Sequence, residues 1–239
     1  MKTSIEVATG ASLVLREPDP ALQQVIAHKA LSGFRQFDGP SADTAQPDVW
    51  PGGNARFDWG SEANARARQV RDQELWGLAG HVVLDLGHGG RPSGFRTFIK
   101  QFKPAGYVGV GPRLPASMRG RKIPEFGAVA SLAAGNSGLP GVLIGGDPLE
   151  MLGRLPDDSV DVAVRHADAF LKPTSLDYRC AVAEQIARVV RPAGLVFGVT
   201  DTSGLFNLLR QTQRFDRSFM PFNYTGKTGF HVLAKIPTD

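Results

Sequence analysis

After residue 80 the chain alternates short apolar runs with glycine-rich turns and amphipathic segments. The apolar runs are each too short for a buried helix, and their scarcity of polar positions is typical of strands that are covered on both faces. They lie at residues 82–86, 107–110, 142–144, 160–164 and 195–199. Between them, apolar residues at helical spacing predict helices at 93–103 and 174–191, followed by a helix at 205–210 and last strands near Phe219 and at 230–236. Strands that alternate with helices predict an α/β protein with a doubly wound, mostly parallel sheet, which binds ligands at the carboxyl ends of its strands.

Residues 1–80 follow a different pattern. Asp19 and Pro20 supply a cap and a first-turn proline for a helix that we expect to end near Gly33. Prolines and glycines interrupt every periodicity at 35–60, although this segment carries four large aromatic residues, Phe37, Trp50, Phe57 and Trp59. A loop with so many aromatic rings has to pack on something or cover something. The sequence therefore predicts a helical, aromatic-rich cover at 1–80 and an α/β domain at 81–239.

The composition narrows the class of protein further. Among 239 residues, 28 glycines and 17 prolines argue against a helical bundle. The one cysteine, Cys180, excludes an intrachain disulfide framework and multi-thiolate metal sites, and its place on the apolar side of a predicted helix favours an inert core residue. We expect no metal site.

The charge and hydropathy patterns bear on partners and location. The net charge is +4, and the positive excess falls after residue 80, which suits an anionic ligand. No apolar stretch is long enough for a membrane span, and the N-terminus lacks the pattern of a secretory signal, so we expect a cytoplasmic protein.

The first strand and its turn carry the most informative motif. Residues 82–90 read Val-Val-Leu-Asp-Leu-Gly-His-Gly-Gly, which resembles the first motif of class I S-adenosylmethionine (SAM) dependent methyltransferases. Glycine is needed in such a turn because the ligand approaches the backbone so closely that a Cβ would intervene. Further segments resemble later motifs of the same family in the expected order: 107–110, 146–149, 155–161 and 184–194.

The resemblance implies a seven-stranded sheet, with the strand near 231–235 antiparallel, and SAM as cofactor. It implies that Asp85 binds the amino group of SAM, directly or through water, although Asp85 could instead cap the turn. Asp147 would receive the adenine amino group or would serve as the capping residue of a Gly-Asp-Pro turn. The full set of implied cofactor-binding residues is Asp85, Gly87, His88, Gly89, Gly90, Gly111, Asp147, Pro148 and Leu149.

Two departures from the family pattern affect the expected affinity. The family usually ends its second strand in an acidic residue that accepts both ribose hydroxyls, whereas Gly111 stands at this position here. Hydrogen bonds to a charged group contribute roughly 1.5–3 kcal/mol each, so their loss weakens SAM binding unless another group substitutes. The third glycine of the first motif is also displaced by Arg91 and Pro92, and Pro92 disfavours the dinucleotide pattern of a dehydrogenase.

The end of the fourth strand supplies the catalytic candidates. His166 follows this strand where the family often places catalytic groups, and a histidine there can act as a general base near neutral pH, with Asp168 as the second candidate. A hydrogen-bonded structural histidine is the alternative. The segment 165–168 does not resemble the Asp/Asn-Pro-Pro-Tyr signature of amino-group DNA methyltransferases.

A basic cluster is the remaining feature that could identify a partner. Arg113, Arg119, Arg121 and Lys122 form either a solvated face or a site for an anionic partner such as RNA, but no aromatic residue is interleaved among them, so nucleic acid is not the expected partner. The leading hypothesis is SAM-dependent methyl transfer to a small-molecule acceptor. The rival is a methyltransferase-like binding or scaffold protein without catalysis, which Gly111 motivates.

Overall fold

The computed structural model describes residues 4–8, 11–29, 80–87, 104–111, 122–123, 127–131, 141–165, 171, 174–198, 204–216, 222–224 and 228–237. The predicted helix at 93–103 and the aromatic segment at 35–60 lie outside the described residues.

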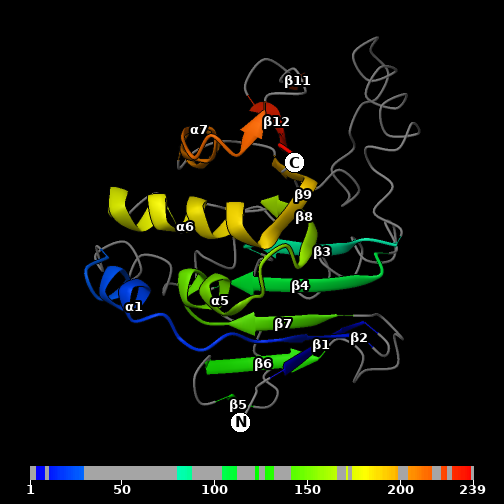
Figure 1. The fold of residues 1–239 in the computed structure, drawn as a ribbon, viewed down its shortest axis with the longest axis vertical. Coiled ribbons are helices and arrows are strands. Elements are labelled where there is room, and N and C mark those ends of the chain that lie inside the picture. The colour runs from blue at the N-terminus through cyan, green and yellow to red at the C-terminus, as the bar shows by residue number, and fades with distance from the viewer. Residues whose placement is uncertain are drawn as a thin grey trace.

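Five parallel strands form the centre of a mixed sheet (Figure 1). Their order across the sheet is β7 (Val142–Gly145), β4 (Gly106–Gly111), β3 (Val82–Leu86), β8 (Val160–Arg165) and β9 (Val190–Gly198). Each adjacent pair among them is parallel. These are the five strands that the apolar runs predict, so the doubly wound parallel arrangement is confirmed.

Antiparallel strands extend both sides of this parallel centre. On one side β12 (Thr228–Lys235) pairs with β9, and β10 (Phe215–Asp216) and β11 (Phe222–Tyr224) pair with β12. The antiparallel last strand confirms the expectation. On the other side β6 (Gly127–Ser131) pairs with β7, and β5 (Lys122–Ile123) pairs with β6. The part of the sheet that the structure describes thus has ten strands, more than the expected seven, because the β5–β6 hairpin and β11 add to its edges.

The structure describes four helices, and all but the last begin after a residue whose side chain accepts hydrogen bonds from the first backbone N–H groups. They are α1 (Pro20–Ala27), α5 (Pro148–Arg154), α6 (Leu176–Val189) and α7 (Leu205–Gln211). Asp19 caps α1, as predicted, and accepts from the Ala21 N–H at 2.9 Å. Ser175 caps α6 by accepting from the Tyr178 N–H at 3.2 Å. Helix α5 was not predicted, because its capping residue was taken only as part of a turn.

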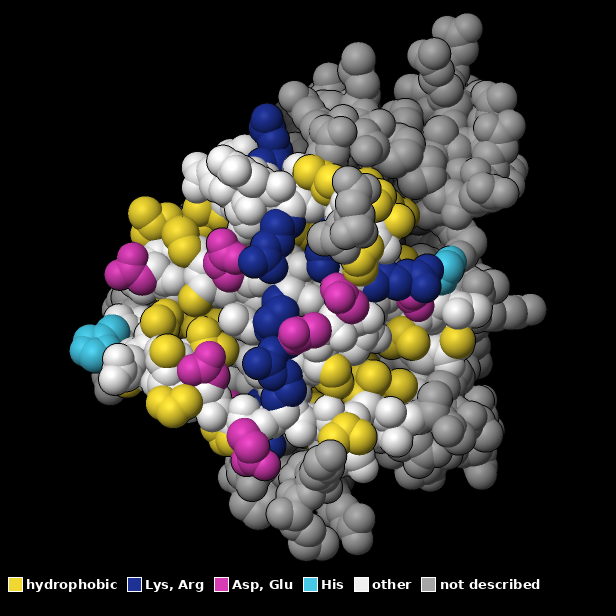
Figure 2. Space-filling model, viewed as in Figure 1, with side chains coloured by type: hydrophobic (Ala, Val, Ile, Leu, Met, Phe, Trp, Pro, Cys, Tyr) yellow, Lys and Arg dark blue, Asp and Glu magenta, His cyan; other side chains and the backbone are white. Residues whose placement is uncertain are grey.

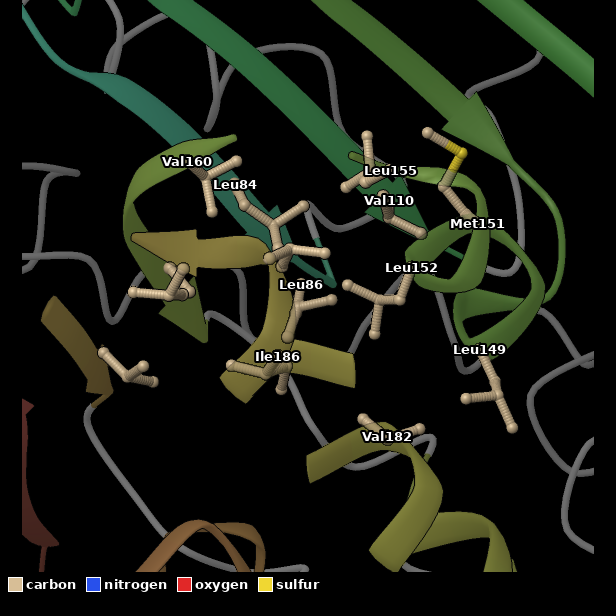
Figure 3. Packing of buried hydrophobic residues seen from close by; sticks show 14 of the residues in the cluster. Leu84, Leu86, Val110, Leu149, Met151, Leu152, Leu155, Val160, Val182 and Ile186 are labelled. Atoms are coloured by element: carbon tan, nitrogen blue, oxygen red, sulfur yellow. The ribbon is translucent and has the colours of Figure 1, made fainter. Parts of the chain in front are cut away.

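The core lies between the sheet and helices α5 and α6 (Figure 3). Leu84 and Leu86 of β3 pack there with Leu152 of α5 and Ile186 of α6, and all four are at most 1% exposed. The alternating residues of the strands, such as Val83 and Tyr107, project to the opposite face and are also buried. Both faces of the central strands are therefore covered, which explains their mainly apolar sequences.

One prediction about α6 was wrong: Cys180 is partly exposed, although the sequence placed it on the buried, apolar side of the helix. Leu176, the first residue of α6, is 57% exposed. The buried stripe instead runs through Tyr178, Val182 and Ile186, whose spacing of four residues keeps them on one face. Cys180 lies about half a turn from Tyr178 and therefore faces away from the sheet.

The N-terminal residues share the core of the sheet. A hairpin of β1 (Ser4–Ala8) and β2 (Ala11–Val14), which the sequence did not predict, places Ile5 and Val7 in the core cluster. Helix α1 packs on α5 and α6 on the same face of the sheet (Figure 1). A Cβ on Gly106, at the start of β4, would lie 2.9 Å from the Val7 carbonyl oxygen, so this close approach requires glycine.

Candidate functional site

The carboxyl ends of four parallel strands meet at one edge of the sheet. Leu86 of β3 pairs with Val110 of β4 and with Arg165 of β8. The turns after these strands are joined by hydrogen bonds: the Gly87 N–H donates to the Val110 carbonyl at 2.8 Å, and the Gly146 N–H donates to the Gly111 carbonyl at 3.0 Å. The chain leaves β3 toward β4 on one side and later returns to β8 on the other, which makes this edge a topological switch point, the usual ligand position in such sheets.

Gly87 occupies a backbone conformation that favours glycine. Its φ is +86°, in the left-handed region where a side chain costs about 1–2 kcal/mol. The turn after β3 therefore keeps its backbone bare at the point where the resemblance expects a ligand.

Asp85 is the most unusual polar residue at this edge. Its side chain is fully buried, and Oδ2 accepts a hydrogen bond from the Tyr107 hydroxyl. Its other oxygen, Oδ1, is buried with no hydrogen-bond partner in the described structure. Burial raises the pKa of Asp85 to about 7, although the hydrogen bond from Tyr107 opposes the rise. A buried acceptor without a partner costs free energy, so it commonly marks a position that a ligand or water completes.

Glycines surround Asp85 on its face of the sheet. The side chains of Tyr107 and Asp85 are hydrogen-bonded, so they lie on the same face of the sheet. Because side chains alternate between the two faces along a strand, Gly109 and Gly111 also lie on this face. Gly145 of β7 pairs with Gly111 and extends the same row. The ligand-side end of this face thus carries little side-chain bulk, although all three glycines are buried.

Asp147 acts as the capping residue of α5. Its Oδ1 accepts from the Leu149 N–H at 2.9 Å, the Glu150 N–H at 3.3 Å and the Tyr178 hydroxyl at 2.8 Å. Its Oδ2 forms an ion pair with Lys29, just after α1, and both side chains are at most 13% exposed. The Lys29 ammonium also lies 5.8 Å from the centre of the Tyr178 ring. The capping alternative is therefore realised, and an adenine amino group would have to share this carboxylate with Lys29.

The other predicted site residues divide into two groups. Pro148 and Leu149 are the first residues of α5, and both are buried, Leu149 in the core cluster. Their role toward a cofactor stays a prediction. His88, Gly89, Gly90, His166 and Asp168 lie outside the described residues, as does the basic cluster at 113–121; the backbone of β8 ends at Arg165, directly before His166.

Sequence reasoning missed three residues of this region: Tyr107, Tyr178 and Lys29. A signal was available for Tyr107, because a phenolic hydroxyl in a strand that is buried on both faces needs a polar partner. Lys29 carries no local signal, since its partner lies 118 residues away.

A second charged region lies at the opposite, amino edge of the sheet. A cleft of about 490 Å³ is lined there by Arg188, Arg214 and Lys235 together with Asp157 and Asp158. In the view of Figure 2, Lys and Arg side chains form a band that is flanked by acidic side chains. Arg188 pairs with Asp157 and lowers the pKa of that carboxyl, and Lys235 pairs with Asp158 at 2.8 Å. The Arg188–Asp157 pair joins the end of α6 to the segment before β8, and the Lys235–Asp158 pair joins the end of β12 to the same segment.

Two further properties of the described residues concern metal binding and membrane spanning. These residues contain no group of three or more His, Cys, Asp or Glu that could hold a metal ion. Within the same parts of the chain, no helix combines the length and the hydropathy needed to cross a bilayer.

Comparisons with known proteins support the fold. No protein-family model and no curated protein matches the chain. A solved structure of 1,6-didemethyltoxoflavin-N1-methyltransferase from Burkholderia thailandensis, with its substrate and S-adenosylhomocysteine bound, is similar with a TM-score of 0.51 and 14% identity over 98% of this chain and 99% of that chain.

Two further solved structures have lower scores. The [4+2]-cyclase SpnF matches with a TM-score of 0.49 and 13% identity over 94% of this chain and 99% of that chain. A SAM-dependent methyltransferase from Methanosarcina mazei matches with a TM-score of 0.44 and 15% identity over 66% of this chain and 94% of that chain. The similarity to the Burkholderia thailandensis structure shows that the chain has the class I methyltransferase-like fold that the motifs predicted.

Proposed function

We propose that the protein binds SAM at the carboxyl edge of its sheet and transfers the methyl group to a small-molecule acceptor. The observation that carries this proposal is Asp85: a buried carboxylate with an unpartnered oxygen, at the end of the central strand and two residues before the left-handed Gly87. A carboxylate in this position suits a cationic group such as the amino group of SAM. The bare backbone of the turn suits close approach of the ligand.

The residues present fit one end of SAM better than the other. Asp85 and Gly87 suit the amino-acid end. Gly111 offers no carboxylate to the ribose, and Asp147 already accepts four hydrogen bonds or ion-pair contacts. The proposal therefore includes a weaker affinity than a site with the full set of acidic groups would have.

When bound, SAM supplies an electrophilic methyl group on a sulfonium centre. The task of this chain's residues is to hold the acceptor atom in line with that methyl group and to exclude water, because positioning supplies much of the catalysis in such transfers. Strand β8 ends at the same edge as Asp85, and His166 and Asp168 come after it in the sequence; they are the proposed bases for removing a proton from the acceptor. The small-molecule class of acceptor agrees with the similar Burkholderia thailandensis enzyme, whose structure holds 1,6-didemethyltoxoflavin.

A second function has its own supporting observation. Two contacts that the family makes to the adenosine part of SAM are affected. Asp147 Oδ2 already pairs with Lys29, and Gly111 has no carboxylate to accept the ribose hydroxyls. A protein with these features could keep the fold and serve as a binding or scaffold subunit.

Calorimetric titration with SAM and with S-adenosylhomocysteine separates the two functions. The enzyme proposal expects saturable binding with one site per chain, followed by formation of S-adenosylhomocysteine when an acceptor is present. A folded sample that gives no binding heat at millimolar SAM would favour the scaffold function instead.

A further inference from the structure

We propose that Tyr107 is a positioning residue of the cofactor site, which holds Asp85 through its hydroxyl hydrogen bond to Oδ2 and leaves Oδ1 for a cationic group of the ligand. The inference rests on the proposed function, and it assigns a role to a residue outside the motifs that suggested SAM. Tyr107 acts on the ligand through Asp85 and is not itself a catalytic residue.

The register of the strands explains how the hydroxyl reaches the carboxylate. Tyr107 pairs with Val83, and the residue opposite Asp85 is Gly109. Tyr107 and Gly109 are on the same face of β4, so the ring meets no side chain at the position beside Asp85. Both Tyr107 and Asp85 are 0% exposed, which shields their hydrogen bond from competition with water.

The surroundings of Asp85 make this bond decisive for its charge. The side chains beside Asp85 on this face of the sheet are uncharged. They are Val83 on its own strand, β3, and Val162 and Val164 on the adjacent strand β8. Among the residues that the structure describes, Tyr107 is the titratable group that faces Asp85. The hydrogen bond stabilises the charged form, while burial favours the protonated form, which cannot pair with a cation.

A linkage between ligand and proton follows. A cationic ligand group binds the carboxylate form, so binding near neutral pH displaces a proton from Asp85 into the buffer. Over the range in which the ligand's own amino group stays protonated, affinity should rise with pH as Asp85, whose pKa is about 7, becomes ionised. Without the Tyr107 hydroxyl this pKa rises further, and the same affinity is reached only at higher pH.

The experiment measures SAM binding by calorimetry from pH 5.5 to pH 9.5, in pairs of buffers with different ionisation enthalpies, so that both affinity and proton release are obtained. For Tyr107→Phe we expect the midpoint of the affinity rise to move to higher pH. Relative to the wild type, the affinity at pH 7 should fall about tenfold for each unit of that shift, and the ratio of the two affinities should return toward one at pH 9.5, because the titration of the ligand's own amino group cancels in this ratio. A purely structural role for Tyr107 would instead lower the affinity equally at every pH.

Two further variants make the test specific. Asp85→Asn should abolish the rise of affinity through neutral pH and the proton release that accompanies it, and adding Tyr107→Phe to it should cause no further shift. Tyr178→Phe is the matched control, because it removes another buried tyrosine hydroxyl that donates to a carboxylate, that of Asp147. Its affinity midpoint should stay at the wild-type pH.

The outcomes separate this inference from the proposed function. If the wild-type protein binds SAM but Tyr107→Phe leaves its pH dependence and proton release unchanged, the role of Tyr107 is overturned while the function stands. If the folded wild-type protein binds neither SAM nor S-adenosylhomocysteine at any pH, the proposed function fails, and the cofactor role of Tyr107 fails with it. Infrared titration of the buried carboxyl band, without ligand, then still reports whether the hydroxyl controls the charge of Asp85.

Discussion

Replacing Asp85 by asparagine should stabilise the ligand-free protein at high pH, although it removes a residue from the proposed site. In the folded protein the pKa of Asp85 is raised from 3.8 to about 7, mainly by burial. The folded state therefore holds a proton that the unfolded state releases between about pH 4 and pH 7. The unfolded state binds fewer protons in this window, so the free energy of unfolding falls as pH rises through it.

The size of the effect follows from the pKa shift. A shift of about three units corresponds to about 4 kcal/mol of lost stability above pH 7. Asparagine avoids this cost but leaves an amide N–H without a partner, which costs about 1–3 kcal/mol. The net gain at pH 8 should be about 1–3 kcal/mol, and the advantage of the variant should grow by about 3 kcal/mol between pH 5 and pH 8.

Urea unfolding of the ligand-free protein across this pH range measures the effect. Asp177→Asn is the control, because it removes an exposed carboxylate from the first turn of α6 and should show no comparable growth with pH. If Asp85→Asn loses the same stability at pH 5 and pH 8, then Asp85 is a structural residue with a satisfied carboxylate, and the reasoning for the site is refuted.

Three further substitutions test other parts of the account. Gly87→Val should abolish SAM binding in the protein that remains folded. Gly80→Val is the control, because Gly80 is also left-handed but has open space around it, and it should lower only the melting temperature. Retained binding in the Gly87 variant would show that this turn does not bind the cofactor. Gly111→Asp should tighten SAM binding about tenfold at pH 8, since Gly111 is an extended strand residue that accepts a side chain without φ strain, and an unchanged or lower calorimetric affinity would show that this position does not face the ribose. Lys29→Met should lower the free energy of unfolding by about 1–3 kcal/mol, because it removes the ion-pair partner of Asp147 Oδ2. The same change should strengthen SAM binding, because it frees that oxygen for the ligand. Weaker binding would mean that Lys29 supports the ligand rather than competing with it.

The sequence was most informative where the structure depends on local periodicity. Strands β3, β7 and β8 are short, mainly apolar runs, and this pattern was sufficient to place them within a residue or two. The hairpins β1–β2 and β5–β6 were missed, because short segments such as Gly127–Ser131 become strands only by pairing with a neighbouring strand.

The candidate site was predicted in its backbone and missed in its long-range contacts. The turn at Gly87 follows from local glycine chemistry. By contrast, the choice between ligand binding and capping at Asp147 depends on Tyr178 and Lys29, which are distant in the sequence and close only after folding. The bond between Tyr107 and Asp85 is non-local in the same way, since it depends on the register of β3 and β4.

A crystal structure of the protein with S-adenosylhomocysteine would test the central claim most directly. We expect the ligand to lie across the carboxyl ends of β3 and β4, with its amino group hydrogen-bonded to Asp85 Oδ1, directly or through one water molecule. The claim would be contradicted by crystals that show this edge empty at saturating ligand, or by a ligand bound at another place, such as the charged cleft that Arg188 and Lys235 line at the amino edge.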